Sequence, residues 1–340
     1  MTTLTVHEIS KTLGGSAVLD NVSLVIPTGT RTALVGASGS GKTTLLRLIA
    51  GFSRPDRGTI ALDDTVVSGR DVFLPAHRRG VGYVPQDGAL FPHLTVEQNI
   101  RFGLRHAQRG STRIAEVAEL VALPLELLRR FPHEISGGQQ QRVAVARALA
   151  PAPKMIVLDE PFSALDTSLR EHSRLAVIAA LEASDATAVL VTHDQDEALM
   201  FGHQIGVLAD GLLLQHGHPS AVFDKPVTAE VAAFLGDAVF LTARIDDSTA
   251  ITAFGAVAIR HRASVAGSRV MLRPEQLSVR TDGAANGVVR AIRPRGASSY
   301  IEIEALGGGE RVTVSVFAAE SECRVGDEVS VVIRGTVVSY

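Results

Sequence analysis

Apolar and polar positions follow two different patterns along this chain, and the change falls at about residue 236. Before it, short apolar runs such as Thr32–Val35 and Met155–Leu158 alternate with helix-like segments, as in a doubly wound parallel sheet. After it, short segments alternate apolar and polar residues, and Gly307–Gly309 separates two of them like a hairpin turn. The pattern predicts an α/β domain over residues 1–235 and a β-rich domain over residues 236–340.

Residues from about 87 to 147 interrupt the alternation of strands and helices and are predicted to be mostly helical. Thr95–Gly103 opens one expected helix, and the spaced apolar residues of Ile114–Ala122 indicate another. A last helical stretch is expected from about Thr228 to Leu235 and ends at Gly236. In the C-terminal part we expect short strands at Arg269–Leu272, Gly287–Ile292, Tyr300–Glu304, Arg311–Val316 and Glu328–Ile333.

Composition argues against several classes of protein. The 340 residues carry 33 Lys and Arg against 36 Asp and Glu, a formal net charge of −3, so no nucleic-acid partner is expected. The single cysteine, Cys323, excludes an internal disulfide framework and suits a reducing cytosol. No N-terminal stretch has the build of a signal peptide, and no apolar run is long enough to cross a bilayer. If the protein drives transport, other chains must form the pore.

A glycine-rich loop follows the run Thr32–Val35 and leads into the helix-like segment Thr44–Ala50. It has the form G-x-x-x-x-G-K-T, whose backbone N–H groups bind phosphates with help from the positive end of the following helix. Lys42 is expected to reach the β- and γ-phosphates, and the Thr43 hydroxyl to bind Mg²⁺. A turn without ligand is the alternative, but the strand–loop–helix context favours a nucleoside-triphosphate site. Its residues are Gly36, Ala37, Ser38, Gly39, Ser40, Gly41, Lys42, Thr43 and Thr44.

A second motif, Ile135–Arg142, reads ISGGQQQR and resembles the signature sequence of ABC-type ATPases, a family of P-loop NTPases, with Ile135 in place of the usual Leu. It precedes an apolar helix-like segment, so its free N–H donors form an anion site. The resemblance implies that this site faces the γ-phosphate bound by a second copy of the chain, in a head-to-tail dimer. A simple helix cap is the alternative interpretation. The residues concerned are Ser136, Gly137, Gly138 and Gln139.

Two carboxylates follow the buried strand expected at Met155–Leu158. Acids at the carboxyl end of such a strand lie where open α/β sheets bind ligands. Asp159 resembles the Walker-B aspartate, which supports Mg²⁺ through water. Glu160 resembles the residue that polarises the attacking water, and Pro161 ends the strand. A pair of acids on a solvated turn is the alternative.

Three further positions resemble the switch residues of ABC ATPases. Gln86, within YVPQ, resembles the Q-loop glutamine, which contacts Mg²⁺ and water and relays the nucleotide state to a transport partner. Asp166, at the end of SALD, resembles the D-loop residue at the dimer interface. His193 follows the apolar run Ala188–Thr192 and resembles the histidine that contacts the γ-phosphate. With all these positions present, we expect an active ATPase that uses ATP and Mg²⁺.

One position departs from the family. Relatives place an aromatic residue near the N-terminus against the adenine ring, whereas Leu13 stands at this place here. Loss of an aromatic contact costs about 0.5–1.5 kcal/mol. We therefore expect weaker discrimination between bases, with GTP better tolerated, while the phosphate contacts still dominate binding.

The resemblance to importer ATP-binding subunits covers the whole chain and is strongest up to about residue 235. It implies a helical subdomain over about 87–147 and an OB-like regulatory (TOBE-type) domain after residue 236, where the triplet Arg273–Glu275 resembles a motif of that domain. It also implies integral membrane permease subunits, an extracytoplasmic solute-binding protein, and a peripheral position at the cytoplasmic face of the membrane. For the C-terminal domain, extension of the dimer contact and ligand sensing both stay open.

The segment that follows the Q-loop glutamine bears on the cargo. Gln86–Val96 is similar to the same segment of ferric-iron import (Fbp-type) ATPases, which usually carry Glu where Asp87 stands. Sulfate, polyamine, thiamine and sugar importers share much of it. His93 is interpreted as a surface or helix-entry residue because the ATPase need not touch the cargo. A soluble ABC ATPase acting on DNA or ribosomes is disfavoured because no coiled-coil insertion or second cassette is recognised. A non-hydrolysing regulator is disfavoured by intact Glu160 and His193.

Overall fold

The computed structural model describes residues 2–104, 111–163, 165, 167–263, 268–295, 298–307, 309–317 and 323–340. The chain divides into two compact units, residues 1–219 and 220–340. This division comes before the boundary that the sequence indicates near residue 236. The reason is that the short helices after residue 219 are bonded to the β-rich unit: the Arg273 guanidinium donates to the carbonyl oxygens of Ala232, Gly236 and Asp237.

The first unit is built on two sheets. A six-stranded sheet has the order β10-β9-β3-β8-β7-β6, in which all neighbours are parallel except β10, which pairs antiparallel with β9. A four-stranded sheet has the order β2-β1-β4-β5. The strands are β1 Leu4–Leu13, β2 Ser16–Ile26, β3 Arg31–Val35, β4 Arg57–Leu62, β5 Thr65–Ser68, β6 Val81–Val84, β7 Met155–Asp159, β8 Thr187–Thr192, β9 Gln204–Ala209 and β10 Leu212–Gly217.

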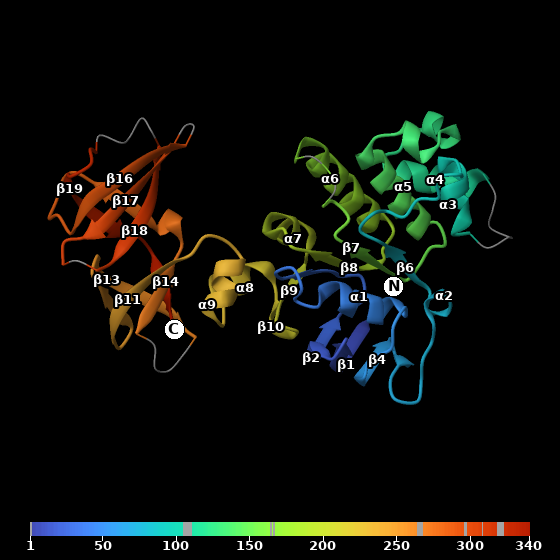
Figure 1. Ribbon diagram of the computed structural model, residues 1–340, viewed down its shortest axis with the longest axis horizontal. Helices are drawn as coiled ribbons and strands as arrows, with labels where there is room; N and C mark the ends of the chain where they lie inside the picture. The colour runs from blue at the N-terminus through green and yellow to red at the C-terminus, as the bar shows by residue number, and fades with distance from the viewer. Residues whose placement is uncertain are drawn as a thin grey trace. The chain divides into compact units, whose positions relative to one another are not determined.

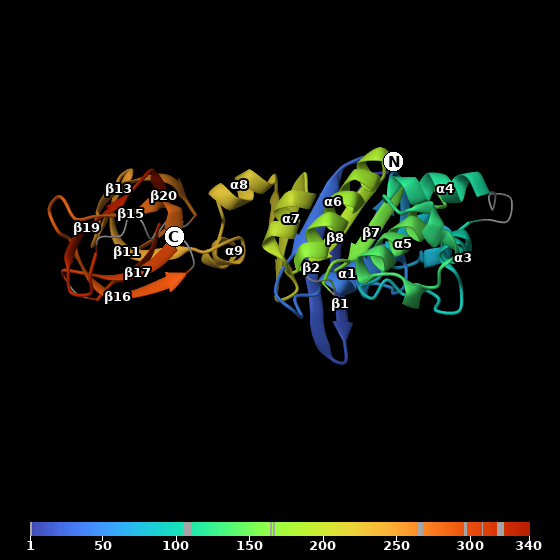
Figure 2. The same cartoon turned by 90° about the horizontal axis from the view of Figure 1, so that it is seen from above.

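The helices of the first unit cover these sheets. They are α1 Lys42–Ala50, α2 Ala76–Arg79, α3 Val96–Phe102, α4 Ser111–Leu120, α5 Gly137–Leu149, α6 Thr167–Ala183 and α7 Gln195–Phe201, with 3₁₀ turns at Leu125–Arg129 and Pro132–Glu134. Figure 1 shows α3, α4 and α5 grouped beside the β6 edge, which confirms the predicted helical insert. In Figure 2 the long β1–β2 hairpin extends beyond α1.

Helix α1 is held between the two sheets by its apolar face. Leu45, Leu46, Leu48 and Ile49 are fully buried in a core that also contains residues of β1, β2, β7 and β8. Each such side chain contributes about 1.5–3 kcal/mol when it leaves water. This packing fixes the start of α1, and therefore Lys42 and Thr43, against the carboxyl ends of the parallel strands. Gly51, with φ +89°, ends the helix as expected.

The second unit begins within α8 Pro219–Asp224 and continues with α9 Ala229–Phe234, which is the helix expected from about Thr228 to Leu235. A closed barrel, β11-β12-β13-β20-β14, and a five-stranded sheet, β15-β19-β16-β17-β18, share one apolar core. All five strands expected here are present. The strands are β11 Val239–Asp246, β12 Thr249–Thr252, β13 Gly255–Arg262, β14 Arg269–Leu272, β15 Leu277–Arg280, β16 Gly287–Arg295, β17 Ser298–Ala305, β18 Arg311–Phe317, β19 Glu328–Ile333 and β20 Thr336–Ser339, with a 3₁₀ turn at Pro274–Gln276. Among the described residues, no helix is long and apolar enough to cross a membrane.

Candidate functional site

The glycine-rich loop between β3 and α1 leaves no room for a side chain at its first and last glycines. A Cβ atom on Gly36 would lie 2.1 Å from the carbonyl oxygen of Leu208, and one on Gly41 would lie 2.6 Å from that of Val18. Gly41 also has φ +98°, a conformation that other residues rarely adopt. The close approach of neighbouring backbone therefore requires glycine at both ends of the loop.

Lys42 is buried at the base of the loop, with 4% of its surface exposed. Its Nζ donates to the carbonyl oxygens of Gly36, at 2.7 Å, and Ala37, at 2.8 Å. Burial lowers the pKa of Lys42, and the nearby carboxylates of Glu160 and Asp159 oppose that change. The ammonium group is thus placed inside the loop, where phosphate oxygens are expected to bind.

A cavity of about 300 Å³ lies over the loop and the start of α1. It is lined by Val18, Ser38, Gly39, Gly41, Lys42, Thr43, Thr44, Gln86 and Glu160. Val18 was not predicted, because its place in the wall depends on how the β1–β2 hairpin folds over the loop. Leu13 ends β1 of that hairpin and is 50% exposed, so its side chain is available for contact with a ligand.

Asp159 ends β7 with both carboxylate oxygens hydrogen-bonded. Thr43 Oγ1 donates to Oδ1 at 2.9 Å, and the Tyr83 hydroxyl donates to Oδ2 at 3.3 Å. Burial raises the pKa of Asp159, while these two hydrogen bonds lower it. The hydroxyl of Thr43, the carboxylate of Asp159 and the amide of Gln86 are the oxygen ligands that Mg²⁺ prefers, so this donor set fits the metal.

Glu160 is the residue on which three separate segments meet. Its Oε2 lies 3.0 Å from His193 Nδ1 and 3.4 Å from Gln86 Nε2. Glu160 has φ +43°, a backbone conformation that costs a residue with a side chain about 1–3 kcal/mol. Its backbone N–H donates to the carbonyl oxygen of Val191 at 2.9 Å, which ties the turn to β8. The strained turn directs the carboxylate to the cavity over Lys42.

The signature residues stand at the start of α5. Ser136 and Gln139 form a capping box: the Ser136 hydroxyl accepts from the Gln139 N–H at 3.3 Å, and the Gln139 side chain accepts from the Ser136 N–H at 2.9 Å. Ser136 and Gly137 are exposed, whereas Gly138 is buried. None of these residues lines the phosphate cavity of the same chain as described above. Asp166, the expected D-loop residue, lies outside the described residues.

The segment after Gln86 is attached to the helical subdomain by two side chains. Arg147 of α5 donates to the carbonyl oxygens of Gly88 and Ala89, each at 2.7 Å. Asn99 of α3 is fully buried and bonds both the N–H and the carbonyl of Phe91. Asp87 and His93 are exposed, and Leu90 and Phe91 are only partly buried, so this segment forms a surface as well as a packing contact.

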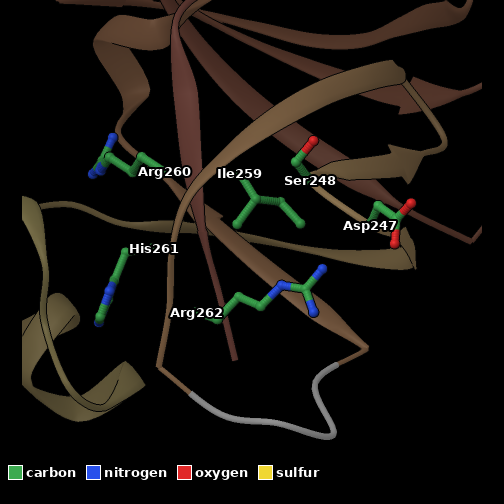
Figure 3. Close-up of a pocket in the computed structure, with 6 residues that line it drawn as sticks. All are labelled: Asp247, Ser248, Ile259, Arg260, His261 and Arg262. Atoms are coloured by element: carbon green, nitrogen blue, oxygen red, sulfur yellow. The ribbon is translucent and has the colours of Figure 1, made fainter.

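The β-rich unit has a shallow hollow of about 280 Å³, lined by Asp247, Ser248, Ile259, Arg260, His261 and Arg262. In Figure 3, Arg260 and His261 lie on one side of the strand, and Arg262 extends on the side of Asp247. Arg260 already donates to the carbonyl oxygens of Asp224 and Thr336. The polar groups of this hollow do not converge on one point.

Comparison with known families and structures agrees with this geometry. Residues 19–163 match the ABC transporter family, and residues 270–338 match the TOBE domain. The dimeric ATP-binding cassette MJ0796, in a post-hydrolysis state bound to ADP and Pi, superposes with a TM-score of 0.55 at 30% identity, over 64% of this chain and 98% of that one. A nucleotide-free cassette of an ABC transporter gives 0.57 at 26% identity, over 64% of this chain and 92% of that one. The fold and the site define an ABC-type ATPase with an OB-like C-terminal domain.

Relatives of nearly the same length show to which group of ABC-type ATPases the chain is similar. The Fe(3+) ions import ATP-binding protein of Pseudomonas fluorescens is 50% identical, over 91% of this chain and 89% of the relative. One from Rhodococcus jostii is 47% identical, over 99% of this chain and 98% of the relative, and one from Yersinia pestis is 44% identical, over 98% of each. The chain belongs to the family of ABC transporter ATP-binding proteins, in the group of Fbp-type importer ATPases.

Proposed function

We propose that this protein is the ATP-hydrolysing subunit of an importer for ferric iron, peripheral at the cytoplasmic face of the membrane. One observation carries the ATPase mechanism: the Glu160 carboxylate borders the phosphate cavity of Lys42 and lies within 3.0 Å of His193 and 3.4 Å of Gln86. The near-full-length likeness to Fe(3+) import proteins supports the choice of cargo.

The charged and polar residues at the phosphate cavity have different parts in the reaction. Lys42 and the loop N–H groups bind the β- and γ-phosphates, and Thr43, Gln86 and Asp159 would hold Mg²⁺. When bound, Mg²⁺ neutralises charge on the phosphate oxygens. Glu160 accepts a hydrogen bond from the attacking water and orients it in line with the γ-phosphate.

His193 has two parts in this scheme. It restrains the Glu160 carboxylate through the 3.0 Å contact, and it contacts the γ-phosphate from the exposed side of the cavity. With 57% of its side chain exposed, it is accessible to a ligand that enters from that side. Leu13 supplies only apolar contact to the base, so GTP is expected to be tolerated better than in relatives with an aromatic residue at this place.

A second copy of the chain completes the site. Ser136 and Gly137 are exposed at the amino end of α5 and do not line the phosphate cavity of their own chain, and the Ser136 hydroxyl and the Gly137 N–H are suited to donate to an anion. We propose that they bind the γ-phosphate held by the partner in a head-to-tail dimer, with Asp166 at the same interface. The dimeric state of the MJ0796 cassette supports this arrangement.

Coupling to transport is assigned to the surface after Gln86. Asp87 and His93 are exposed on the segment that follows Gln86, and the Gln86 side chain donates to Glu160. The backbone of this segment is hydrogen-bonded to side chains of α3 and α5. We propose that the permease binds there and that a solute-binding protein delivers cargo to the permease from the other side. ATP can then shift the conformational equilibrium of the permease, provided that the contact energy of ATP differs between the open and the closed dimer.

The cargo is tested by reconstitution. The chain and its permease are placed in proteoliposomes, and hydrolysis and uptake are measured with solute-binding protein loaded with ferric iron. We expect stimulation with ferric iron and none with sulfate, spermidine, thiamine or maltose and their binding proteins. Stimulation by one of the latter would reassign the cargo. Hydrolysis that no permease or cargo changes would instead support a soluble ABC ATPase.

A further inference from the structure

Tyr83 opens the YVPQ segment, and its contact with the carboxylate of Asp159 belongs to none of the motif roles described above. Its hydroxyl donates to Asp159 Oδ2 at 3.3 Å, while Thr43 donates to Oδ1 at 2.9 Å. Strand β6 pairs with β7 so that Tyr83 lies opposite Val157, two residues before Asp159. The register of the two strands therefore brings the phenol to the carboxylate.

The tyrosine ring is held in place from a third direction. It packs edge-to-face on Phe52, with centroids 5.0 Å apart and planes at 65°. Phe52 directly follows Gly51, the cap of α1, and Tyr83 stands three residues before Gln86. The ring borders a groove of about 620 Å³ whose walls include Thr43, Gln86 and Asp159. Tyr83 thus touches the end of the nucleotide helix and the Walker-B strand, and it begins the Q-loop.

We propose that Tyr83 is a positioning residue for Asp159. Rotation of a carboxylate about its last bond is weakly restrained, because that torsion is broad. With Thr43 bonded to one oxygen and Tyr83 to the other, the Asp159 carboxylate is fixed in one plane beside the Mg²⁺ position. This inference rests on the proposed function, since it takes Asp159 as the metal-supporting residue.

The expected size of the effect follows from other metal sites. Hydrogen-bond partners of a ligating carboxylate change metal affinity by about 10–100-fold when they are removed. Asp159 is proposed to act through water, so the lower end of that range applies. The alternative is that Tyr83 is only a packing partner of Phe52, in which case the hydroxyl contributes nothing to metal binding.

Tyr83→Phe separates the two roles because it keeps the ring and removes only the hydroxyl. We expect the free Mg²⁺ concentration for half-maximal ATP hydrolysis to rise about tenfold. The turnover at saturating Mg²⁺ should stay within about twofold of wild type, because Glu160 and Lys42 are untouched. Tyr300→Phe makes the same chemical change in β17 and should leave both values unchanged. An unaltered Mg²⁺ requirement in Tyr83→Phe overturns the proposal.

Phe52→Leu tests packing by itself, because it removes the ring contact and keeps the hydroxyl. We expect no change in the Mg²⁺ requirement. A shift as large as that of Tyr83→Phe would assign the effect to packing and overturn the positioning role. Circular dichroism and the unfolding transition of both variants show whether the fold is retained.

A spectroscopic measurement needs neither metal nor hydrolysis. The chain has no Trp and three Tyr, so Tyr300→Phe with Tyr340→Phe leaves Tyr83 as the only source of tyrosine fluorescence. A carboxylate that accepts the phenol proton quenches tyrosine fluorescence. We therefore expect Asp159→Asn to brighten the emission of this metal-free protein, and unchanged emission would show that the contact is absent.

Together the measurements separate this inference from the function on which it rests. If Asp159→Asn raises the Mg²⁺ requirement and Tyr83→Phe does not, Asp159 keeps its role and the proposal for Tyr83 fails. If neither variant changes the Mg²⁺ requirement, the proposed metal site is itself wrong. A brighter emission in Asp159→Asn, combined with a tenfold higher Mg²⁺ requirement in Tyr83→Phe, supports both the metal site at Asp159 and the positioning role of Tyr83.

Discussion

His193 Nδ1 lies 3.0 Å from Oε2 of Glu160, although the two residues come from different strand ends. Asp159 and Thr192, the last residues of β7 and β8, are neighbours at one edge of the parallel sheet, and the register Asp159↔Val191 brings the following residues together. The Glu160 side chain is only 18% exposed, whereas that of His193 is 57% exposed. A contact this open to water adds little stability, so its value is the orientation of the carboxylate.

Removal of this restraint should slow the reaction without weakening nucleotide binding. We expect His193→Ala to lower the rate of ATP hydrolysis at least about tenfold, because a misplaced catalytic group loses much of its advantage. The dissociation constant for ATP should change little, since Lys42 and the loop remain. His77→Ala, an exposed histidine on α2, is the control. Equal turnover in the two variants would remove His193 from the mechanism.

The shared site can be tested by crosslinking between chains. In a Cys323→Ser background, Ser38→Cys on the phosphate loop and Ser136→Cys at the start of α5 place one thiol on each proposed face; both positions are exposed. We expect a covalent dimer under oxidation only when ATP is present, most strongly with Glu160→Gln. Either single-cysteine chain alone is the control. A crosslink that forms equally well without nucleotide, or only within one chain, contradicts the head-to-tail dimer.

Coupling is expected to depend on the exposed residues after Gln86. Asp87→Ala and His93→Ala should reduce cargo uptake by the assembled transporter while ATP binding by the isolated subunit is unchanged. The two side chains are exposed, so neither change disturbs the core. Glu171→Gln, on the exposed face of α6, is a control for surface changes elsewhere. If uptake and permease assembly both survive, the coupling surface lies elsewhere and the Fbp-type assignment of this segment loses support.

Buried Glu197 predicts a pH-dependent stability. Burial raises its pKa from 4.5 to about 7, although a hydrogen bond from Thr192 opposes the change. A raised carboxyl pKa means that the stabilising contribution is complete below pH 4.5 and is lost as pH rises through about 7. The loss is on the order of 3 kcal/mol.

The measurement is the free energy of unfolding in urea at several pH values. We expect Glu197→Gln to remove most of the decline between pH 5 and 8, because the amide carries no charge. Asp196→Asn, an exposed neighbour on the same helix, should retain the wild-type slope. A slope that Glu197→Gln leaves unchanged would show that another group titrates over this range.

The parts of the site that a sequence can predict are those made by local spacing. The phosphate loop needs only its own glycines and a following helix, and β7 and β8 are buried at every position, so both were expected. The roles of Val18 and Tyr83 depend on hairpin folding and strand register, which no local pattern states. The β1–β2 pair has register shifts between Val6 and Ile9 and again after Ile9. These shifts break the alternation of apolar and polar residues by which strands are recognised.

The C-terminal unit shows the same limit. Strands β16, β17 and β18 follow one another as antiparallel neighbours with clear alternation, and all three were expected. The barrel closes through β13 and β20, a parallel pair from distant parts of the chain, which the sequence pattern did not indicate. The early boundary of the unit likewise rests on Arg273. The sequence shows the Arg273–Glu275 triplet, but the bonds from Arg273 to the carbonyl oxygens of Ala232 and Gly236 follow only from the folded chain.

Glu160 is proposed to activate water for the hydrolysis of ATP bound at Lys42. Glu160→Gln keeps the size of the side chain and removes its charge, and Glu171→Gln makes the same change on the surface. The measurement is phosphate release by the assembled transporter, with the oligomeric state followed in ATP and Mg²⁺. We expect release at least about a hundredfold slower than wild type, with ATP still bound and two subunits held together. Wild-type turnover by Glu160→Gln would contradict the account.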